Sequence, residues 1–246
     1  MNEGDIGKLF DPKPDLTFGC LRNEYMIAKD EAGNFIDIFR LHENGMQRVP
    51  YKTIKSRFLG VVKPRNLQQR LAIDMLYDDE MTVKVITGKF GTGKDFLMCS
   101  AAVDLLENNK FDKIVYVRNN IEVKDSKPIG FLPGSCNEKL LPFAMPMSDH
   151  LGGIDGLEIM MRQGKIEVVH LGFIRGRDIK NSIIICSEAE NTTKEHIQLY
   201  AGAASGRTTH PDGRSGHFLH SYQQHGSRIT GDIQSRHCLL YTSRCV

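Results

Sequence analysis

The sequence lacks several features that would place it in a specialised class of protein. No window of the 246 residues approaches a run of about eighteen apolar residues, so no membrane-spanning helix is expected. The first twenty residues lack the basic-then-apolar layout of a secretion signal. With 40 % hydrophobic residues and 23 glycines, the composition fits neither a wholly disordered chain nor a collagen-like one.

Charge and cysteine usage also point to no special partner. The 32 basic and 30 acidic side chains leave a formal net charge of +2, which is too weak to indicate nucleic-acid binding by itself. The six cysteines form no CxxC pair. We therefore expect reduced thiols in a cytoplasmic protein rather than a disulfide framework or a zinc site. The length allows one domain, or one and a fraction.

The N-terminal part divides into two short segments. Residues 1–22 show no period and are interpreted as a flexible lead-in. Two β-prone runs, residues 25–28 and 35–39, flank a Gly-Asn turn and predict a hairpin. A third short strand is expected within residues 57–62. Together these strands make residues 23–62 a small β appendage to the larger region that begins at residue 63.

From residue 63 to residue 200 the pattern alternates between strands and helices. A helix is expected from Asn66, after Pro64, because apolar residues line one side of it. The further expected strands are 83–87, 114–117, 166–169 and 183–186, and the further helices are 96–106, 138–151 and 157–161. Strands that are apolar throughout and alternate with helices are typical of the α/β class. They predict a parallel sheet with helices on both faces.

A phosphate-binding loop is the strongest single motif. It follows an apolar strand and opens a helix, and it consists of Gly88, Lys89, Phe90, Gly91, Thr92, Gly93 and Lys94. Glycines let backbone N–H groups curl around a phosphate, and the helix N-terminus adds positive potential. Lys94 would reach the β/γ oxygens. The alternative is a glycine-rich turn without function.

The residue after the loop lysine departs from the usual pattern. A Ser or Thr whose hydroxyl ligates Mg²⁺ is typical there, but this chain has Asp95. A later apolar strand should end in Asp-Glu, and here it ends in Ser187 and Glu188. The hydroxyl and the carboxylate have thus changed places, which keeps one of each for Mg²⁺ if the two side chains flank the same ion. The alternative is a degenerate site that binds nucleotide poorly.

Other residues are candidates for catalysis or base recognition. Glu188 suits a general base or a water-orienting group, although a carboxylate that starts a helix is the alternative. Gln69 could bond an adenine edge, or it could be an ordinary surface glutamine. Arg118, Arg175 and Arg177 lie at strand ends and could contact phosphates within the chain or across a subunit boundary. Solvated arginines are the alternative for each.

These residues and others resemble the PhoH-like ATPase family over about residues 23–199. The GFLPG segment, with the Glu, Lys, Pro and Asp positions that follow it, is more specific than the phosphate loop. The matching positions are 88–94, Arg118, 130–134, Glu138, Lys139, Pro142, Pro146, Asp149, 175–177 and 188–193. Departures from the family pattern are Asp95, Ser187, and Glu190 where the family usually has Gln.

The resemblance implies a RecA-like P-loop NTPase that uses ATP and Mg²⁺ and is related to superfamily 1 helicases. It also implies a homo-oligomer, often a hexamer, whose work is linked to single-stranded RNA. Family versions in which a PIN nuclease precedes the core do not match, because residues 1–62 are too few for one. RNA cleavage is therefore not part of the expectation.

The pattern fails over residues 201–246. This segment shows no helical or strand period where the family continues with a Gly-Arg-Val-Gly-Glu-Gly-like turn and a core strand. Residues 202–207 can be encoded so that a shifted reading frame yields Gly-Arg-Val-Gly-Glu, which suggests a frameshift near Tyr200. Residues 238–246 resemble the translation of a transposon end used in sequencing libraries, and an ordinary exposed tail is the alternative. The segment is interpreted as scrambled or truncated, with the last core strand missing.

The sequence therefore predicts ATP binding and hydrolysis coupled to RNA remodelling or translocation. Lys94, Glu188, Arg118 and Arg177 are the catalytic candidates, and Asp95 and Ser187 are the metal candidates. Two other functions remain open. One is a nucleotide-binding switch without turnover, motivated by Asp95, Ser187 and Glu190. The other is a truncated fragment with no function.

Overall fold

The structure, a computed structural model, describes residues 3–11, 17–89, 91–118, 141–170, 173–174, 177, 179–187, 217–223 and 237–240. Two compact units, Met1–Lys52 and Thr53–Val246, are each described by themselves. No helix in these ranges is long and apolar enough to cross a membrane. Among the described residues, the cysteines at positions 20, 99 and 186 are free thiols.

The first unit contains the predicted hairpin. Strands β1 (Tyr25–Lys29) and β2 (Phe35–His42) pair antiparallel, and β3 (Gly45–Arg48) adds a third strand beside β2. In the turn, the Asn34 N–H donates to Asp30 Oδ1 at 2.7 Å, and Gly33 adopts a φ of 85° that side chains rarely allow. The β-prone runs and the turn residues therefore suffice to specify this element.

Residues 1–22, interpreted from the sequence as a flexible lead-in, contain a helix. Helix α1 spans Glu3–Phe10 and places Leu9, only 2 % exposed, in a cluster with Phe39 and Met46. The Phe10 ring lies edge-on to the Phe39 ring, with centroids 5.4 Å apart. Helices this short take most of their stability from tertiary packing, which a local sequence pattern does not reveal.

The second unit begins earlier than the sequence suggested, because a second hairpin belongs to it. Strands β4 (Ile54–Ser56) and β5 (Gly60–Val62) pair antiparallel. The carboxylate of Glu107, at the end of helix α3 (Lys94–Glu107), accepts hydrogen bonds from Ser56 Oγ and from the N–H groups of Arg57 and Phe58 at 2.7–3.1 Å. The β region predicted over residues 23–62 is therefore divided between the two units after residue 52. The contact with Glu107 joins residues about fifty positions apart, so the local sequence pattern did not indicate it.

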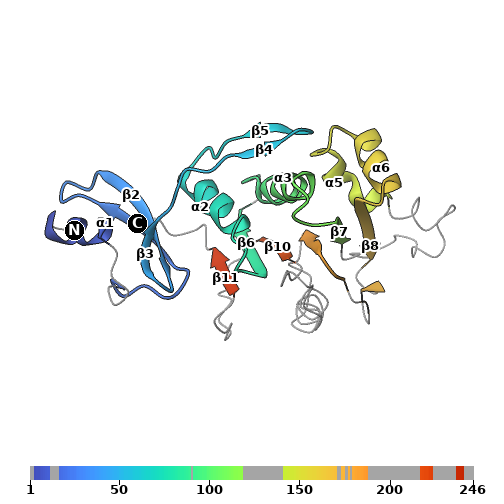
Figure 1. The fold of residues 1–246 in the computed structure, drawn as a ribbon. Coiled ribbons are helices and arrows are strands. Elements are labelled where there is room, and N and C mark those ends of the chain that lie inside the picture. Colours follow the sequence, from blue (N-terminus) through green and yellow to red (C-terminus); the bar gives the residue numbers. More distant parts are fainter. Residues whose placement is uncertain are drawn as a thin grey trace. The chain divides into compact units, whose positions relative to one another are not determined.

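A six-stranded parallel sheet forms the centre of the second unit (Figure 1). Its strands in spatial order are β11 (His237–Leu240), β6 (Val83–Gly88), β10 (His217–Gln223), β9 (Ser182–Ser187), β7 (Lys113–Arg118) and β8 (Ile166–His170). All neighbouring pairs run parallel. The predicted α/β class with a parallel sheet is confirmed.

Both faces of the central strands are buried. On one face, Val115 and Ile184 join Ile174 and Ile179 from the β8–β9 connection in one apolar cluster. Residues that alternate with them along β7 and β9, such as Tyr116, are buried as well. This double burial explains why the strands are continuous apolar runs in the sequence rather than alternating ones.

Helices form a layer over the sheet and position the loop between strand and helix. Helix α2 (Leu67–Leu76) begins where the sequence predicts, because the Asn66 side chain accepts a hydrogen bond from the Gln69 N–H at 2.9 Å. Figure 1 shows α2 and α3 on the same side of the strands. The predicted helix over residues 138–151 appears in its described part as η2 (Leu141–Ala144) and α5 (Met145–Ser148), followed by α6 (Ile154–Arg162).

The segment after residue 200 supplies two strands of the sheet, which the sequence did not indicate. Strand β10 lies between β6 and β9, and β11 pairs with the other side of β6. Leu219 of β10 is 2 % exposed. A parallel ladder is made by backbone groups, so a segment without a clear apolar period can still occupy a central position. The frameshift and the library scar concern the coding DNA and stay predictions.

Candidate functional site: a phosphate loop with an exchanged carboxylate and hydroxyl

The glycine-rich segment forms a tight loop between β6 and α3. Gly91 and Gly93 have φ values of 71° and 80°, which is the left-handed region that glycine adopts without strain. Thr92 Oγ1 donates to the Lys89 carbonyl at 2.9 Å and fixes the middle of the loop. Helix α3 begins directly after the loop, so the N–H groups of its first turn, which have no intrahelical partners, face the loop. This arrangement can hold an anion.

Lys94 folds back over the loop. Its Nζ donates to the carbonyl oxygens of Gly88 at 3.0 Å and Lys89 at 2.9 Å. The ammonium group is therefore held above the loop by acceptors that a phosphate oxygen could replace. Charge-assisted hydrogen bonds to an anion are stronger than bonds to neutral carbonyls, so such an exchange is favourable.

Gln69 reaches the loop from α2, although its amide is already engaged within the chain. Its Nε2 donates to the Thr92 carbonyl at 3.1 Å, and its Oε1 accepts from the Arg65 N–H at 2.8 Å. A Cβ added to Gly93 would lie 3.5 Å from the same Nε2. Gln69 thus positions the loop, a role that the sequence reasoning did not consider. Its contact with adenine stays a prediction.

The exchanged pair meets in the structure. Ser187, at the carboxyl end of β9 and 1 % exposed, donates through Oγ to Asp95 Oδ2 at 3.1 Å. Asp95 lies in the first turn of α3, next to Lys94. In the sheet, strand β10 lies between β9, which ends in Ser187, and β6, which leads into the loop. The Ser187–Asp95 hydrogen bond therefore joins elements that are not neighbours in the sheet. The hydroxyl and the carboxylate are therefore side by side at the loop, and their joint binding of Mg²⁺ stays a prediction.

The residues at this pair fit a divalent cation. Asp95 Oδ1 is a buried oxygen without a hydrogen-bond partner among the described residues. A buried unsatisfied carboxylate oxygen is costly, and a hard cation satisfies it. No group of three His, Cys, Asp or Glu side chains that could hold a metal occurs in the described ranges. This is compatible with Mg²⁺, which takes one or two carboxylates and completes its shell with water and phosphates.

Two further side chains lie in the electrostatic field of Asp95. Burial lowers the pKa of the half-buried His150, and the charges of Asp95 and Asp149 oppose that shift. The imidazole lies edge-on to the Phe96 ring at 5.4 Å. Burial, with a contribution from Asp95, raises the pKa of the Cys99 thiol. Sequence reasoning gave His150 no role, although it directly follows Asp149 of the resemblance motif.

Arg118 ends β7 at the same edge of the sheet as the loop. In the ladder its Cα pairs with that of Ser187 on one side and that of His170 on the other. The carboxyl ends of parallel strands meet at one edge, where open α/β sheets bind ligands. The backbone of Arg118 is therefore placed beside the exchanged pair.

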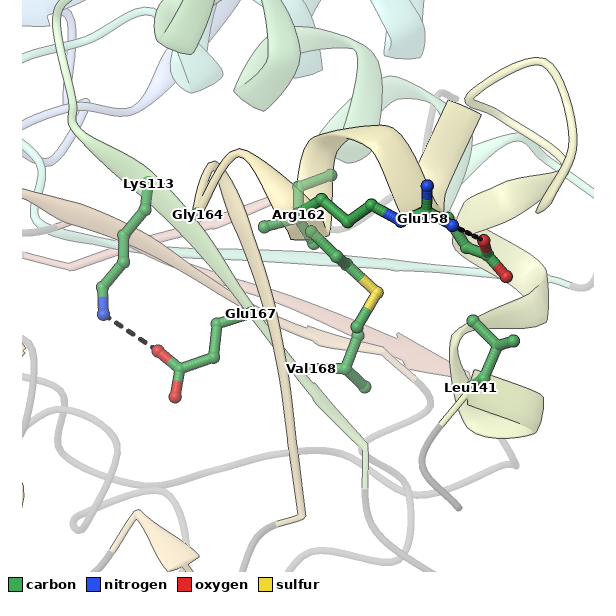
Figure 2. A pocket seen from close by; sticks show the side chains of 9 residues that line it. Lys113, Leu141, Glu158, Arg162, Gly164, Glu167 and Val168 are labelled. Carbon is green, nitrogen blue, oxygen red and sulfur yellow. Dashed lines mark hydrogen bonds and ion pairs between the residues drawn. The ribbon is translucent and has the colours of Figure 1, made fainter. Parts of the chain in front are cut away.

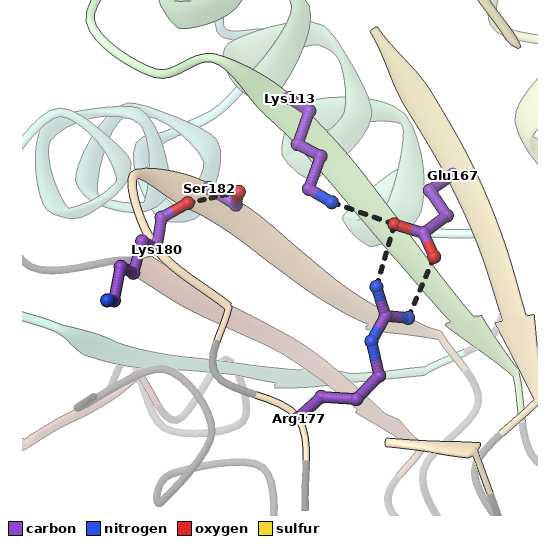
Figure 3. Close-up of polar contacts among 5 residues, drawn as sticks. All are labelled: Lys113, Glu167, Arg177, Lys180 and Ser182. Carbon is purple, nitrogen blue, oxygen red and sulfur yellow. Dashed lines mark hydrogen bonds and ion pairs between the residues drawn. The ribbon is translucent and has the colours of Figure 1, made fainter. Parts of the chain in front are cut away.

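Arg177 is not brought to the loop. Its Nη1 and Nη2 bond the two carboxylate oxygens of Glu167 at 2.7 and 3.1 Å, and Lys113 Nζ bonds Glu167 Oε2 at 2.9 Å (Figure 3). Lys113 begins β7 and Glu167 is the second residue of β8, so this cluster lies at the amino ends of the strands. The hydrogen bonds from Arg177 and Lys113 lower the pKa of Glu167 against the opposing effect of burial.

A pocket of about 560 Å³ lies next to this cluster (Figure 2). Its wall includes Lys113 and Glu167 from the strands, Leu141, and Glu158 and Arg162 from α6. The four charged side chains on its wall form two separate ion pairs. Arg162 Nη2 bonds Glu158 Oε2 at 2.9 Å, and Lys113 Nζ bonds Glu167 Oε2 at 2.9 Å. The charges that line the pocket are thus already satisfied within the chain.

Some predicted site residues lie outside the described residues. They are Glu188, the expected water-orienting group, and Phe90 of the loop, together with Arg175 and Glu190. Their roles stay predictions.

Comparison with known proteins identifies a family and several relatives. The family model described as PhoH-like protein matches residues 61–201, which is more than half of the chain. A PhoH-like protein of Synechocystis sp. is 34 % identical over 148 residues, covering 59 % of this chain and 44 % of the relative. Protein PhoH2 of Bacillus subtilis is 30 % identical over 186 residues, covering 72 % of this chain and 41 % of the relative. The matched segments thus span less than half of either relative.

Proposed function

The chain belongs to the PhoH-like family, and from that premise we propose that it binds and hydrolyses ATP with Mg²⁺. The observation that carries the proposal is the hydrogen bond between Ser187 and Asp95 beside the phosphate loop. A loop with two left-handed glycines, a lysine above it and a carboxylate–hydroxyl pair next to it has the parts that phosphoryl transfer needs.

Each residue has a role in the proposed reaction. The N–H groups of residues 88–93 and the Lys94 ammonium hold the phosphates and stabilise charge that develops on them. Asp95 and Ser187 would hold Mg²⁺, which when bound neutralises phosphate charge and fixes its orientation. Glu188 accepts a proton from, or orients, the attacking water.

The two arginines differ in how well they suit this reaction. We assign the phosphate contact to Arg118, and the support for this is that its backbone lies at the loop edge of the sheet. For Arg177 the bidentate bond with Glu167 supports a structural role in this chain instead. Contact of Arg177 with a phosphate would first require that bond to break.

We further propose, on the family resemblance, that hydrolysis drives remodelling of single-stranded RNA by a homo-oligomer, such as a hexamer, in the cytoplasm. If so, single-stranded RNA should stimulate phosphate release, and the full chain should sediment as an assembly when ATP and Mg²⁺ are present. A monomer whose phosphate release is insensitive to RNA contradicts this part alone and leaves ATP hydrolysis standing.

A nucleotide-binding switch without turnover is the second candidate. The specific observation in its favour is that Asp95 replaces the usual hydroxyl of the loop, which alters the geometry for the cation. Phosphate release and nucleotide binding, measured on the same preparation of the full chain, separate the candidates. Release that requires Mg²⁺ supports hydrolysis, and binding without release favours the switch. Absence of binding together with non-cooperative unfolding indicates a fragment without function.

A further inference from the structure

We propose that Asp95 makes the divalent cation an obligatory partner of the nucleotide, so that the loop accepts a cation–nucleotide complex and rejects free nucleotide. The proposal rests on the proposed ATP function and concerns how that same site selects the form of its ligand. It starts from two atoms of one side chain. Asp95 Oδ2 accepts from Ser187 Oγ at 3.1 Å, while Oδ1 is buried without a hydrogen-bond partner among the described residues.

No positive side chain neutralises this carboxylate in the part of the chain that the structure describes. Its one hydrogen-bond partner there is the neutral hydroxyl of Ser187. The Lys94 ammonium, its sequence neighbour, bonds the carbonyls of Gly88 and Lys89 instead. Among the described residues, the negative charge at the mouth of the loop is therefore not compensated by a cation.

A phosphate in the loop would meet that charge directly, because Asp95 immediately follows the loop lysine in the first turn of α3. A serine or threonine at this position would present a neutral hydroxyl that does not repel phosphate. Like charges a few ångströms apart in a partly buried site weaken binding by a factor on the order of a hundred or more. A divalent cation between the carboxylate and the phosphates turns this repulsion into two attractions.

The described residues alone offer too few ligands to hold the cation tightly. Asp95 and Ser187 supply two oxygens, and no group of three metal-ligating His, Cys, Asp or Glu side chains occurs in the described ranges. Mg²⁺ prefers six oxygens, and phosphates commonly supply some of them. Cation and nucleotide therefore complete each other's binding site, and each should bind poorly without the other.

The test is the affinity of the full chain for a fluorescent ATP analogue, measured with excess Mg²⁺ and again with EDTA. We expect EDTA to weaken binding about a hundredfold. In Asp95→Asn, which keeps the shape and removes the charge, EDTA should change the affinity less than about tenfold, and binding in EDTA should be tighter than in the unaltered chain. Asp95→Thr should show the same direction and serves as a second variant if the first does not fold.

The matched control is Asp155→Asn. Asp155 is an exposed acid in the first turn of α6 and should leave the cation dependence unchanged. The proposal is overturned if the unaltered chain binds the analogue equally well in EDTA, or if Asp95→Asn keeps the full cation dependence. The ATP function then still stands. If the unaltered chain binds the analogue in neither condition, the proposed ATP function fails, and this inference fails with it.

Discussion

Two charged clusters lie at opposite ends of the parallel strands in the second unit. The loop cluster, at the carboxyl ends, consists of Lys94, Asp95 and Ser187, and it leaves a buried carboxylate oxygen without a partner among the described residues. The Glu167 cluster, at the amino ends, consists of Lys113, Glu167 and Arg177, and there both carboxylate oxygens are bonded by cations.

The difference separates a binding site from a structural contact. A cluster whose charges satisfy one another gains nothing from an added ion, whereas a buried oxygen without a partner is stabilised by one. An arginine near a strand end is therefore weak evidence for phosphate binding until its partners are known. Arg177 and Arg118 looked alike in the sequence, and only the backbone of Arg118 lies at the edge of the sheet that carries the loop.

The largest expected effect is on Lys94. Lys94→Ala should lower ATP hydrolysis about a thousandfold, because the cation that stabilises developing phosphate charge is removed. Lys110→Ala, an exposed lysine just beyond the end of the same helix, is the matched control and should leave the rate unchanged. Phosphate release at saturating ATP and Mg²⁺ measures both. A Lys94→Ala protein that melts normally and keeps its activity would remove the loop cluster from the mechanism.

The exchanged pair gives the next largest effect. Asp95→Thr should reduce phosphate release about a hundredfold, because two neutral hydroxyls then face the phosphates without a carboxylate. Adding Ser187→Asp should restore the rate to within about tenfold of the unaltered chain, since the carboxylate returns on the other element. Ser182→Ala, at the opposite end of β9, is the control.

A double variant no better than Asp95→Thr alone would contradict the exchange. Because Ser187 is 1 % exposed, the added carboxylate also has to fit a packed position. Thermal melting of the double variant separates that packing effect from a failure of the exchange itself.

The sequence predicted the order of strands and helices around the loop because apolar runs and glycines are local signals. It also suggested an exchange between Asp95 and Ser187, whose side chains form a hydrogen bond in the structure, while their roles at a metal ion stay predictions. What it could not reveal are long-range partners. The anchoring of the β4–β5 hairpin by Glu107 and the packing of Leu9 join segments that no local pattern relates.

The position of β10 was missed for a related reason. Its pairing with β6 and β9 is made by backbone groups and needs no apolar period in the strand itself. The bidentate bond of Arg177 was missed because Glu167 lies within an apolar strand ten residues earlier, and no sequence pattern relates the two residues. Contacts of both kinds become visible only once the sheet is assembled.

A smaller effect is expected at the Glu167 cluster, and on stability rather than activity. Glu167→Gln should lower the free energy of unfolding by about 1 kcal/mol at neutral pH, a value already reduced for solvent screening because about a third of each side chain is exposed. Nucleotide affinity should not change. Denaturant unfolding and analogue binding on the same samples test this. A loss of affinity with unchanged stability would move Arg177 back among the phosphate contacts.

This contribution should depend on pH in a defined direction. The pKa of Glu167 lies below its ordinary value of 4.5 because Arg177 and Lys113 bond its carboxylate. A folded-state pKa below the unfolded one gives stability that is present above 4.5 and is lost as pH falls through the lower folded value. The stability difference between the unaltered chain and Glu167→Gln should therefore shrink in acid. A difference that grows in acid would contradict the assignment.

The smallest effect is expected for Arg162, which forms an arginine–glutamate ion pair like that of Arg177 but in a more solvent-exposed position. Arg162 and Glu158 form an ion pair one helical turn apart, with side chains 78 % and 38 % exposed. Arg162→Ala should cost about 0.3 kcal/mol of unfolding free energy, and added salt should remove most of the loss. Denaturant unfolding at low and high salt measures it. A salt-independent loss above about 1 kcal/mol would mean that the methylene groups of Arg162 pack in the pocket wall, because apolar burial is insensitive to ionic screening. In that case, packing would explain the stability of this end of the sheet better than charge satisfaction does.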